Sequence, residues 1–311
     1  MDRVSDGRRG MLLGVAAYAM WGLFPLYFPL LEPSGPVEIL AQRLVWSLLT
    51  MLVVVAVLRR GRGVLALVRD RRSAGLLAVA ACAISLNWGV YIGGVVTGHV
   101  VETALGYYIN PLVTVGMGVL VLGERLRLGQ WVAIALVVAA VAVLTVGYGR
   151  PPWIALVLAF SFATYGLLKK TVSAGAVESL TVETGVLFLP ALAVLAVLGV
   201  TGQAQAGSQG FGHALLFTTT GLVTAVPLLC FGAATTRLSL STIGLLQYLT
   251  PTIQFLIGVL VEGEAMPTSR WIGFALVWAA LVVLSVEALR HQRGGAQRAT
   301  TAPSRKSERV R

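Results

Sequence analysis

The sequence predicts an all-α integral membrane protein with ten transmembrane helices arranged as two inverted five-helix repeats. Hydrophobic residues make up 57% of the 311 residues and charged residues only 12%, which is too little polar surface for a soluble domain. Ten apolar runs follow one another, each close to the roughly 20 residues that a helix needs to cross a bilayer. Residues 87–144 also match residues 227–284 without a gap, at a constant shift of 140, so one unit is present twice.

The ten apolar runs define the predicted helices. They cover residues 10–31, 37–58, 75–96, 100–122, 130–147, 152–168, 183–200, 212–234, 240–261 and 270–288. The connections between them are short, so no separate soluble domain is expected. Each half holds an odd number of helices, so the second half enters the membrane from the opposite face. Inverted repeats of this kind are typical of secondary transporters, whose substrate site lies near the midplane.

The predicted organisation has three parts. The first repeat spans residues 1–148 and the second spans residues 149–289. A polar, basic tail follows over residues 290–311, and its lack of an apolar period predicts disorder.

The distribution of charge predicts the orientation of the chain. The net charge is +11, but Lys and Arg lie in alternate loops rather than in one patch, so a nucleic-acid partner is not expected. The other set of loops holds only Arg150 and Arg270. Basic loops face the cytoplasm, which predicts a multi-pass protein of the inner or plasma membrane with both termini inside.

Prolines recur at matching positions of the two repeats. Pro111 and Pro251 lie in the middle of the fourth and ninth predicted helices. Proline removes a backbone hydrogen bond and clashes with the preceding turn, so both helices are expected to bend. The kinks are either purely structural or form a hinge beside the cavity, and the paired positions favour the hinge.

Arg43 is the most informative single side chain. It lies about six residues into the second predicted helix, on the order of 9 Å along it. An arginine at a helix centre costs roughly 2.5–3.5 kcal/mol on insertion scales, so it should face the bundle and find a partner. Glu38 precedes it by five residues, about 500° around the helix, so Glu102 is the better candidate. Arg43 is either a structural or snorkelling charge, or a charge that binds substrate or couples protons.

Two carboxylates are candidates for coupling. Glu102 opens the fourth predicted helix, and Glu183 opens the seventh, where it is the expected inverted counterpart of Glu38. The helix dipole alone favours a carboxylate in the first turn, which is the alternative explanation for both.

Aromatic and amide side chains gather in a few predicted helices. The cavity candidates among them are Trp21, Trp46, Asn87, Trp88, Tyr91, Tyr107, Asn110, Tyr165, Gln247 and Tyr248. Amides in hydrocarbon must be hydrogen-bonded, which turns them toward the interior. A cavity of rings and amides suits an amphipathic organic solute. The alternative for each ring is packing or an interfacial belt.

The sequence holds no recognisable catalytic set, and no metal site or cofactor is expected. A membrane enzyme or a non-transporting scaffold is the alternative function. The expected partners are a small-molecule substrate and the lipid bilayer, and the sequence does not decide between a monomer and a homodimer.

Motifs along the chain resemble the RarD family, in the EamA-type branch of the drug/metabolite transporter superfamily. They are MWGLFPLYF (20–28), EILAQRLVWS (38–47), LNWGVYIGGV (86–95), HVVETALGYYINPL (99–112), LAFSFATYGLLKK (158–170), VPLLCFGAATTRLSLSTIGLLQYLTPTIQFL (226–256) and GFALVWAALVV (273–283). The resemblance implies ten helices, a central cavity, and export or exchange of small organic solutes by alternating access. Many such proteins are described as chloramphenicol-sensitivity proteins. Gln42 stands where a histidine is expected in the family, so no proton coupling is inferred.

Overall fold

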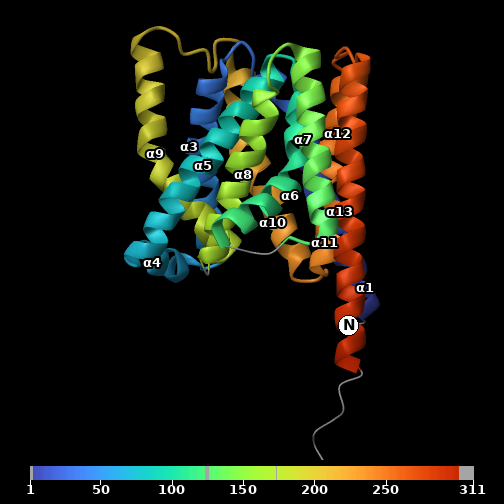
Figure 1. Ribbon diagram of the computed structural model, residues 1–311. Helices are drawn as coiled ribbons and strands as arrows, with labels where there is room; N and C mark the ends of the chain where they lie inside the picture. The colour runs from blue at the N-terminus through green and yellow to red at the C-terminus, as the bar shows by residue number, and fades with distance from the viewer. Residues whose placement is uncertain (1–2, 123–125, 173, 301–311) are drawn as a thin grey trace, which may run out of the picture.

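The protein, described by a computed structural model over residues 3–122, 126–172 and 174–300, is helical in every described element (Figure 1). The elements are α1 (Arg3–Gly22), α2 (Phe24–Tyr27), the 3-10 helix η1 (Phe28–Leu31), α3 (Pro36–Val57), α4 (Gly61–Arg69), α5 (Arg71–Val96), α6 (Val100–Leu122), α7 (Leu128–Tyr148), α8 (Trp153–Thr171), α9 (Ala176–Val200), α10 (Phe211–Thr235), α11 (Leu240–Leu246), α12 (Leu249–Leu260) and α13 (Thr268–Thr300).

Most of the predicted membrane spans correspond to long helices. Among the described residues, eight helices are long and apolar enough to cross a membrane, with α11 and α12 forming one span from residue 242. The pair 6–22 and 24–31, bent by 46°, raises the number to nine if it is a single span. α6 covers the remaining predicted run, but the side chains of its last residues lie outside the described part. The protein is therefore all-helical and multi-pass, and the ten-helix inverted arrangement stays a prediction.

Three boundaries differ from those predicted. The seventh run begins at Ala176 rather than residue 183, because polar Glu178 and Glu183 are buried inside α9. The basic loop after α3 contains the short helix α4. α13 continues to Thr300, so residues 290–300, predicted to be disordered, are helical. Starting a helix is costly, but extending an existing one is not, so the apolar helix α13 can continue into the polar sequence that follows it. Residues 301–311 lie outside the described residues, as do residues 123–125 after the fourth predicted helix.

The helices pack in pairs that join the two halves of the sequence. α3 lies against α9 and α10, α5 against α8, α6 against α8 and α12, and α7 against α13. Close approach requires glycine at two of these contacts. A Cβ on Gly221 of α10 would collide with the backbone of Trp46 in α3, and one on Gly106 of α6 would lie 2.8 Å from the carbonyl oxygen of Ala155 in α8.

The bundle has two chemically different ends. α1 begins and α13 ends at the same end, where α4 also lies (Figure 1). We call it the basic end, because the segment from Arg59 to Arg72 gathers six arginines there. The opposite end, where α3, α6 and α8 begin, is called the far end.

Candidate functional site

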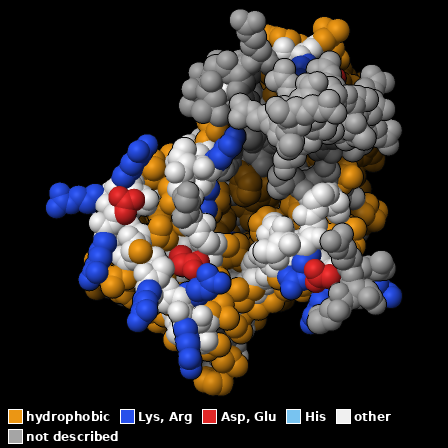
Figure 2. All heavy atoms as spheres, turned by 90° about the horizontal axis from the view of Figure 1, so that it is seen from below, with side chains coloured by type: hydrophobic (Ala, Val, Ile, Leu, Met, Phe, Trp, Pro, Cys, Tyr) orange, Lys and Arg blue, Asp and Glu red, His pale blue; other side chains and the backbone are white. Residues whose placement is uncertain are grey.

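A cavity of about 580 Å³ lies inside the bundle, within the range typical of small-molecule sites. It reaches the basic end through Lys169, Ala174, Ala176 and Ser179. Viewed from that end, Figure 2 shows a hollow lined mainly by hydrophobic side chains. The cavity lies between the two halves, because α1, α2, α3, α5 and α6 of the first half and α8, α9, α10 and α12 of the second contribute to its wall.

Most of the cavity candidates from the sequence line this space. They are Trp21, Arg43, Asn87, Trp88, Tyr91, Tyr107, Asn110, Tyr165 and Gln247, and the hinge candidate Pro251 joins them. The wall therefore combines aromatic rings with a few amides and one deeply buried cation.

Trp46 and Tyr248 do not line the cavity, which corrects their assignment. Trp46 packs against the buried cluster that contains Phe28 and Phe217, because α10 comes very close to α3 at Gly221. Tyr248 packs into the cluster between α6, α7, α12 and α13. Successive helical residues point about 100° apart, so the neighbour Gln247 faces the cavity while Tyr248 turns away.

Arg43 is buried at the inner end of the cavity and pairs with no carboxylate of the described residues; its predicted pairing with Glu102 is wrong. Its Nε donates to Oγ1 of Thr224 at 3.0 Å. Its Cζ lies 4.2 Å from the ring centre of Trp88 and 5.3 Å from that of Phe24. Nη1 is buried and has no hydrogen-bond partner among the described residues. Rings and one hydroxyl hold the guanidinium, and no described residue neutralises its charge.

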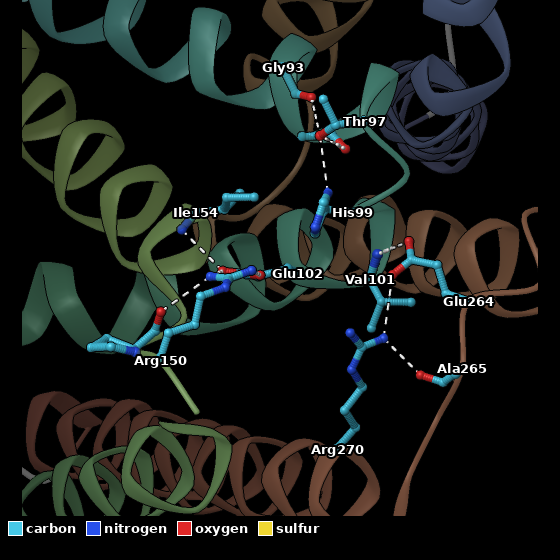
Figure 3. Close-up of polar contacts among 12 residues, drawn as sticks. Gly93, Thr97, His99, Val101, Glu102, Arg150, Ile154, Glu264, Ala265 and Arg270 are labelled. Carbon is cyan, nitrogen blue, oxygen red and sulfur yellow. Dashed lines mark hydrogen bonds and ion pairs between the residues drawn. The ribbon is translucent and has the colours of Figure 1, made fainter. Parts of the chain in front are cut away.

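Glu102 instead joins α6 to the start of α8 at the far end, as Figure 3 shows. Nη2 of Arg150 lies 2.9 Å from its Oε2, and the backbone N–H of Ile154 donates to its Oε1 at 3.1 Å. Arg150 was considered only as a loop charge in the sequence. It lies next to the first turn of α8, where Glu102 meets it, so the carboxylate is already neutralised.

Two more carboxylates bind backbone groups at the far end. Glu38 of α3 accepts hydrogen bonds from the N–H groups of Gln205 and Ala206, at 3.0 and 2.9 Å. Glu264, in the loop after α12, accepts from the N–H of Val101 at 2.8 Å (Figure 3). Burial raises the pKa of Glu264, and the Val101 hydrogen bond and the charge of Arg270 oppose this rise. Each carboxylate thus ties one half of the chain to the other.

Hydrophobic packing closes the far end behind these carboxylates. Phe28, Leu31, Ile39, Val100 and Ile154 belong to one buried cluster, and the last three lie in the first turns of α3, α6 and α8. The cavity is consequently open at the basic end and sealed at the far end.

Glu183 is buried beside the cavity but is already paired. Its Oε1 lies 2.7 Å from Nζ of Lys169, and the hydroxyl of Tyr165 donates to its Oε2 at 3.2 Å. Lys169 lines the cavity and Glu183 does not. The expectation that Glu183 corresponds to Glu38 is wrong, because α9 begins seven residues earlier than predicted.

The true counterpart of Glu38 is Glu178. Each is the third residue of its helix, follows a glycine N-cap (Gly35 or Gly175), and is buried. The shift between them is 140, the same as for the other repeated residues. At this shift Glu183 corresponds to Arg43.

Amide side chains form the polar frame of the wall. Asn87 donates to the carbonyl of Leu158 at 2.9 Å and to Ser161 at 3.0 Å, and it accepts from the hydroxyl of Tyr107 at 3.2 Å. Gln254 donates to the hydroxyl of Tyr91 at 2.9 Å. Gln254 was not among the predicted cavity residues, although its amide inside an apolar run was an available signal. Lys169 was not among them either, because it belongs to the basic loops that served to predict orientation.

The repeat-related prolines lie in different surroundings. α6 runs without a break through Pro111. In the second half α11 ends at Leu246 and α12 begins at Leu249, so Pro251 lies in the first turn of α12. Among the described residues, no group of three or more His, Cys, Asp or Glu is placed to hold a metal ion.

Comparisons with known proteins agree on one family. The EamA-like transporter family matches residues 8–146 and again residues 151–286. A protein named RarD from Streptomyces exfoliatus is 58% identical over 94% of this chain and 93% of its own length. An uncharacterised transporter from Vibrio cholerae serotype O1 is 42% identical over 92% of this chain and 94% of its own length.

A solved structure, described only as the crystal structure of a protein, has the same fold. Its TM-score is 0.57 at 18% identity, covering 90% of this chain and 98% of that one. Together, the two family matches and the full-length relatives show that the chain belongs to the EamA-like transporter family, is of the RarD type, and is a membrane transporter of the drug/metabolite transporter superfamily.

Proposed function

We propose that the protein is a secondary transporter that moves a small organic solute by alternating access, with efflux or exchange as its direction. The observation that carries this proposal is the cavity itself: it is open at the basic end, sealed at the far end, and lined by rings and amides. A solute site that is accessible from one side at a time is what alternating access requires.

The packing of the helices supports an inverted repeat, residues 1–148 and 149–289, as the basis of this mechanism. Contacts occur in related pairs: α1 packs on α10, and the corresponding α8 packs on α5; α1 packs on α12, and α8 packs on α6. The helices α3 and α9, which correspond to each other, also pack directly. In alternating access, the first half would adopt the contacts that the second half now makes, and the second half those of the first. Because the two halves are related by the repeat, the two states would have similar energies.

In the described state, solute enters or leaves at the basic end. If that end faces the cytoplasm, as the charge distribution predicts, the cavity is loaded from inside the cell. The opposite state requires the far end to open. The hydrogen bonds of Glu38, Glu102 and Glu264 with the other half then have to break, since they join elements that would separate.

Transport is tested with purified protein in sealed vesicles, by efflux and counterflow of candidate solutes. Cysteine labelling, in a background without Cys82 and Cys230, tests whether the cavity is open at the basic end. Ala176→Cys, at the mouth of the cavity, should react with an impermeant maleimide from the basic side, and solute should slow the reaction. Thr201→Cys, exposed at the other end of α9, is the control that solute should not affect. Failure of solutes to move in any gradient or to protect Ala176→Cys would contradict the proposal.

A further inference from the structure

We infer that the cavity selects organic monoanions: Arg43 binds the carboxylate or another monovalent acidic group, and the aromatic wall holds an apolar body. This inference rests on the proposed transport function and adds the chemical class of the solute.

The charge of the cavity wall points to an anion. Among the described residues, the lining holds two basic side chains, Arg43 and Lys169, and no carboxylate. Lys169 is paired with Glu183 at 2.7 Å. The unbalanced charge of the wall is therefore the single positive charge of Arg43.

The two carboxylates that were candidate partners of Arg43, Glu38 and Glu102, have other partners. Glu102 is held by Arg150 and the N–H of Ile154 (Figure 3), and Glu38 by the N–H groups after α9. The part of the chain that the structure describes supplies no ion-pair partner for Arg43, in contrast with Glu183, Glu178 and Glu264, which all have one.

The hydrogen bonds of Arg43 are incomplete among the described residues. Thr224 accepts from Nε, and Trp88 and Phe24 cover the guanidinium. The buried Nη1 has no partner among the described residues. A buried cation without a counter-ion is costly, whereas a carboxylate accepts from guanidinium N–H groups in the plane of the fork. Binding an anion thus removes a penalty that the empty cavity carries.

The remaining wall defines the body of the solute. Trp21, Trp88, Tyr91, Tyr107 and Phe231 present rings to a space of about 580 Å³. Flat apolar groups stack well on such rings. The buried Oε1 of Gln254, a residue of the same wall, has no partner among the described residues. The class that fits is a small, singly charged acid with an aromatic or other apolar body.

Three probes with one skeleton and different charge test this inference: 3-phenylpropanoate, 3-phenylpropanamide and 3-phenylpropylamine. Equilibrium binding and the melting temperature are measured on the purified full-length protein with each probe. We expect 3-phenylpropanoate to bind about 10- to 100-fold more tightly than the amide, the range of hydrogen bonds to charged groups. The amine should bind most weakly. These comparisons need no variant, so they do not depend on any mutant folding.

Variants then assign the preference to Arg43. Arg43→Gln should bind the acid and the amide equally, and Arg43→Lys should keep part of the preference, because a lysine is a point charge without the planar fork. Arg62→Gln removes an exposed arginine at the basic end and is the matched control, expected to keep the full preference. The melting temperature without probe checks that each variant is folded.

The outcomes separate this inference from the proposed function. Equal binding of acid and amide by the unmodified protein, tighter binding of the amine, or a preference that survives Arg43→Gln would overturn the anion site and leave transport standing. Failure of all three probes to bind, together with no flux of any solute in vesicles, would overturn both.

Discussion

The helices α3 and α9 begin alike and then differ in one charge. Each has a buried glutamate as its third residue, Glu38 or Glu178, after a glycine N-cap. Five residues later, α3 carries Arg43 and α9 carries Glu183, at positions related by the shift of 140. Both side chains are buried, with relative exposures of 3% and 1%. The duplicated scaffold therefore keeps its helix starts and places opposite charges at one equivalent position.

The surroundings of the two charges explain why their roles differ. Glu183 is neutralised by Lys169 and accepts from Tyr165, so it is a satisfied part of the structure. Arg43 lies among Trp88, Phe24 and Phe28, with one hydroxyl partner. A satisfied pair holds helices together, whereas an unneutralised charge beside a cavity is available to a solute. The comparison supports a structural role for Glu183 and the proposed solute-binding role for Arg43.

The largest effect is expected for Arg43→Ala, measured as flux in vesicles. Removing the cation should lower transport by about 10- to 100-fold, since the charge-assisted contacts with the solute are lost. Arg43→Lys should retain part of the activity. Comparable amounts of folded protein in the membrane are the control. Normal flux by the Ala variant would remove Arg43 from the site.

Glu183→Gln should act on stability first. It leaves the charge of Lys169 without its partner, and the side chain of Lys169 is only 24% exposed. Breaking a fully buried pair costs about 3–5 kcal/mol, and this partial exposure reduces the expected loss to about 1–3 kcal/mol. The double variant Glu183→Gln with Lys169→Met should regain much of the loss. If melting curves show that the single variant is as stable as the unmodified protein, the proposed contrast between positions 43 and 183 fails.

Glu38→Gln and Glu178→Gln extend the comparison to the starts of the two helices. Glu38 holds two backbone N–H groups at the far end, so losing its charge should cost about 1–2 kcal/mol. Glu178 pairs with Arg60, whose side chain is 61% exposed, so its loss should stay below about 1 kcal/mol. Denaturation of the two variants side by side measures the difference. If Glu178→Gln loses more stability than Glu38→Gln, the expectation that the far end depends more on its buried glutamate is wrong.

The helical architecture and much of the cavity wall were accessible from the sequence. Apolar runs predict helices because their length must match the bilayer, and amides such as Asn87 turn inward because hydrocarbon offers them no partner. The sequence did not allow us to predict which of the aromatic rings face the cavity. Gln247 and Tyr248 are neighbours that point in different directions, and the sequence alone does not say which of the two faces the cavity.

The ion pairs could not be predicted, for a different physical reason. Spacing along the chain excludes partners on the wrong face of a helix, as with Glu38 and Arg43, but it does not rank partners on other helices. Glu102 pairs with Arg150 because α6 packs on α8, a contact between the halves that no run of residues encodes. The repeat did contain one signal for the correct correspondence between the halves. At the shift of 140, Arg43 aligns with Glu183, so Glu183 could not be the counterpart of Glu38.

The smallest expected effect concerns Glu264, the far-end carboxylate whose repeat counterpart, Glu124, lies outside the described residues. Burial raises the pKa of Glu264 above its usual value of 4.5. A carboxyl group whose pKa is raised by folding contributes its stability fully below the usual value, and this contribution is lost as the pH rises through the raised pKa.

Folding that raises the pKa of Glu264 should lower the melting temperature of the unmodified protein as the pH rises above 4.5, and Glu264→Gln should flatten this fall. Glu262→Gln removes one charge from an exposed neighbour in the same loop and should keep the original profile. A steeper fall in the Glu264 variant would mean that the hydrogen bond to Val101 and the charge of Arg270 outweigh burial. The far end would then be held most firmly when Glu264 is charged, and its opening would be favoured by acid instead of by base.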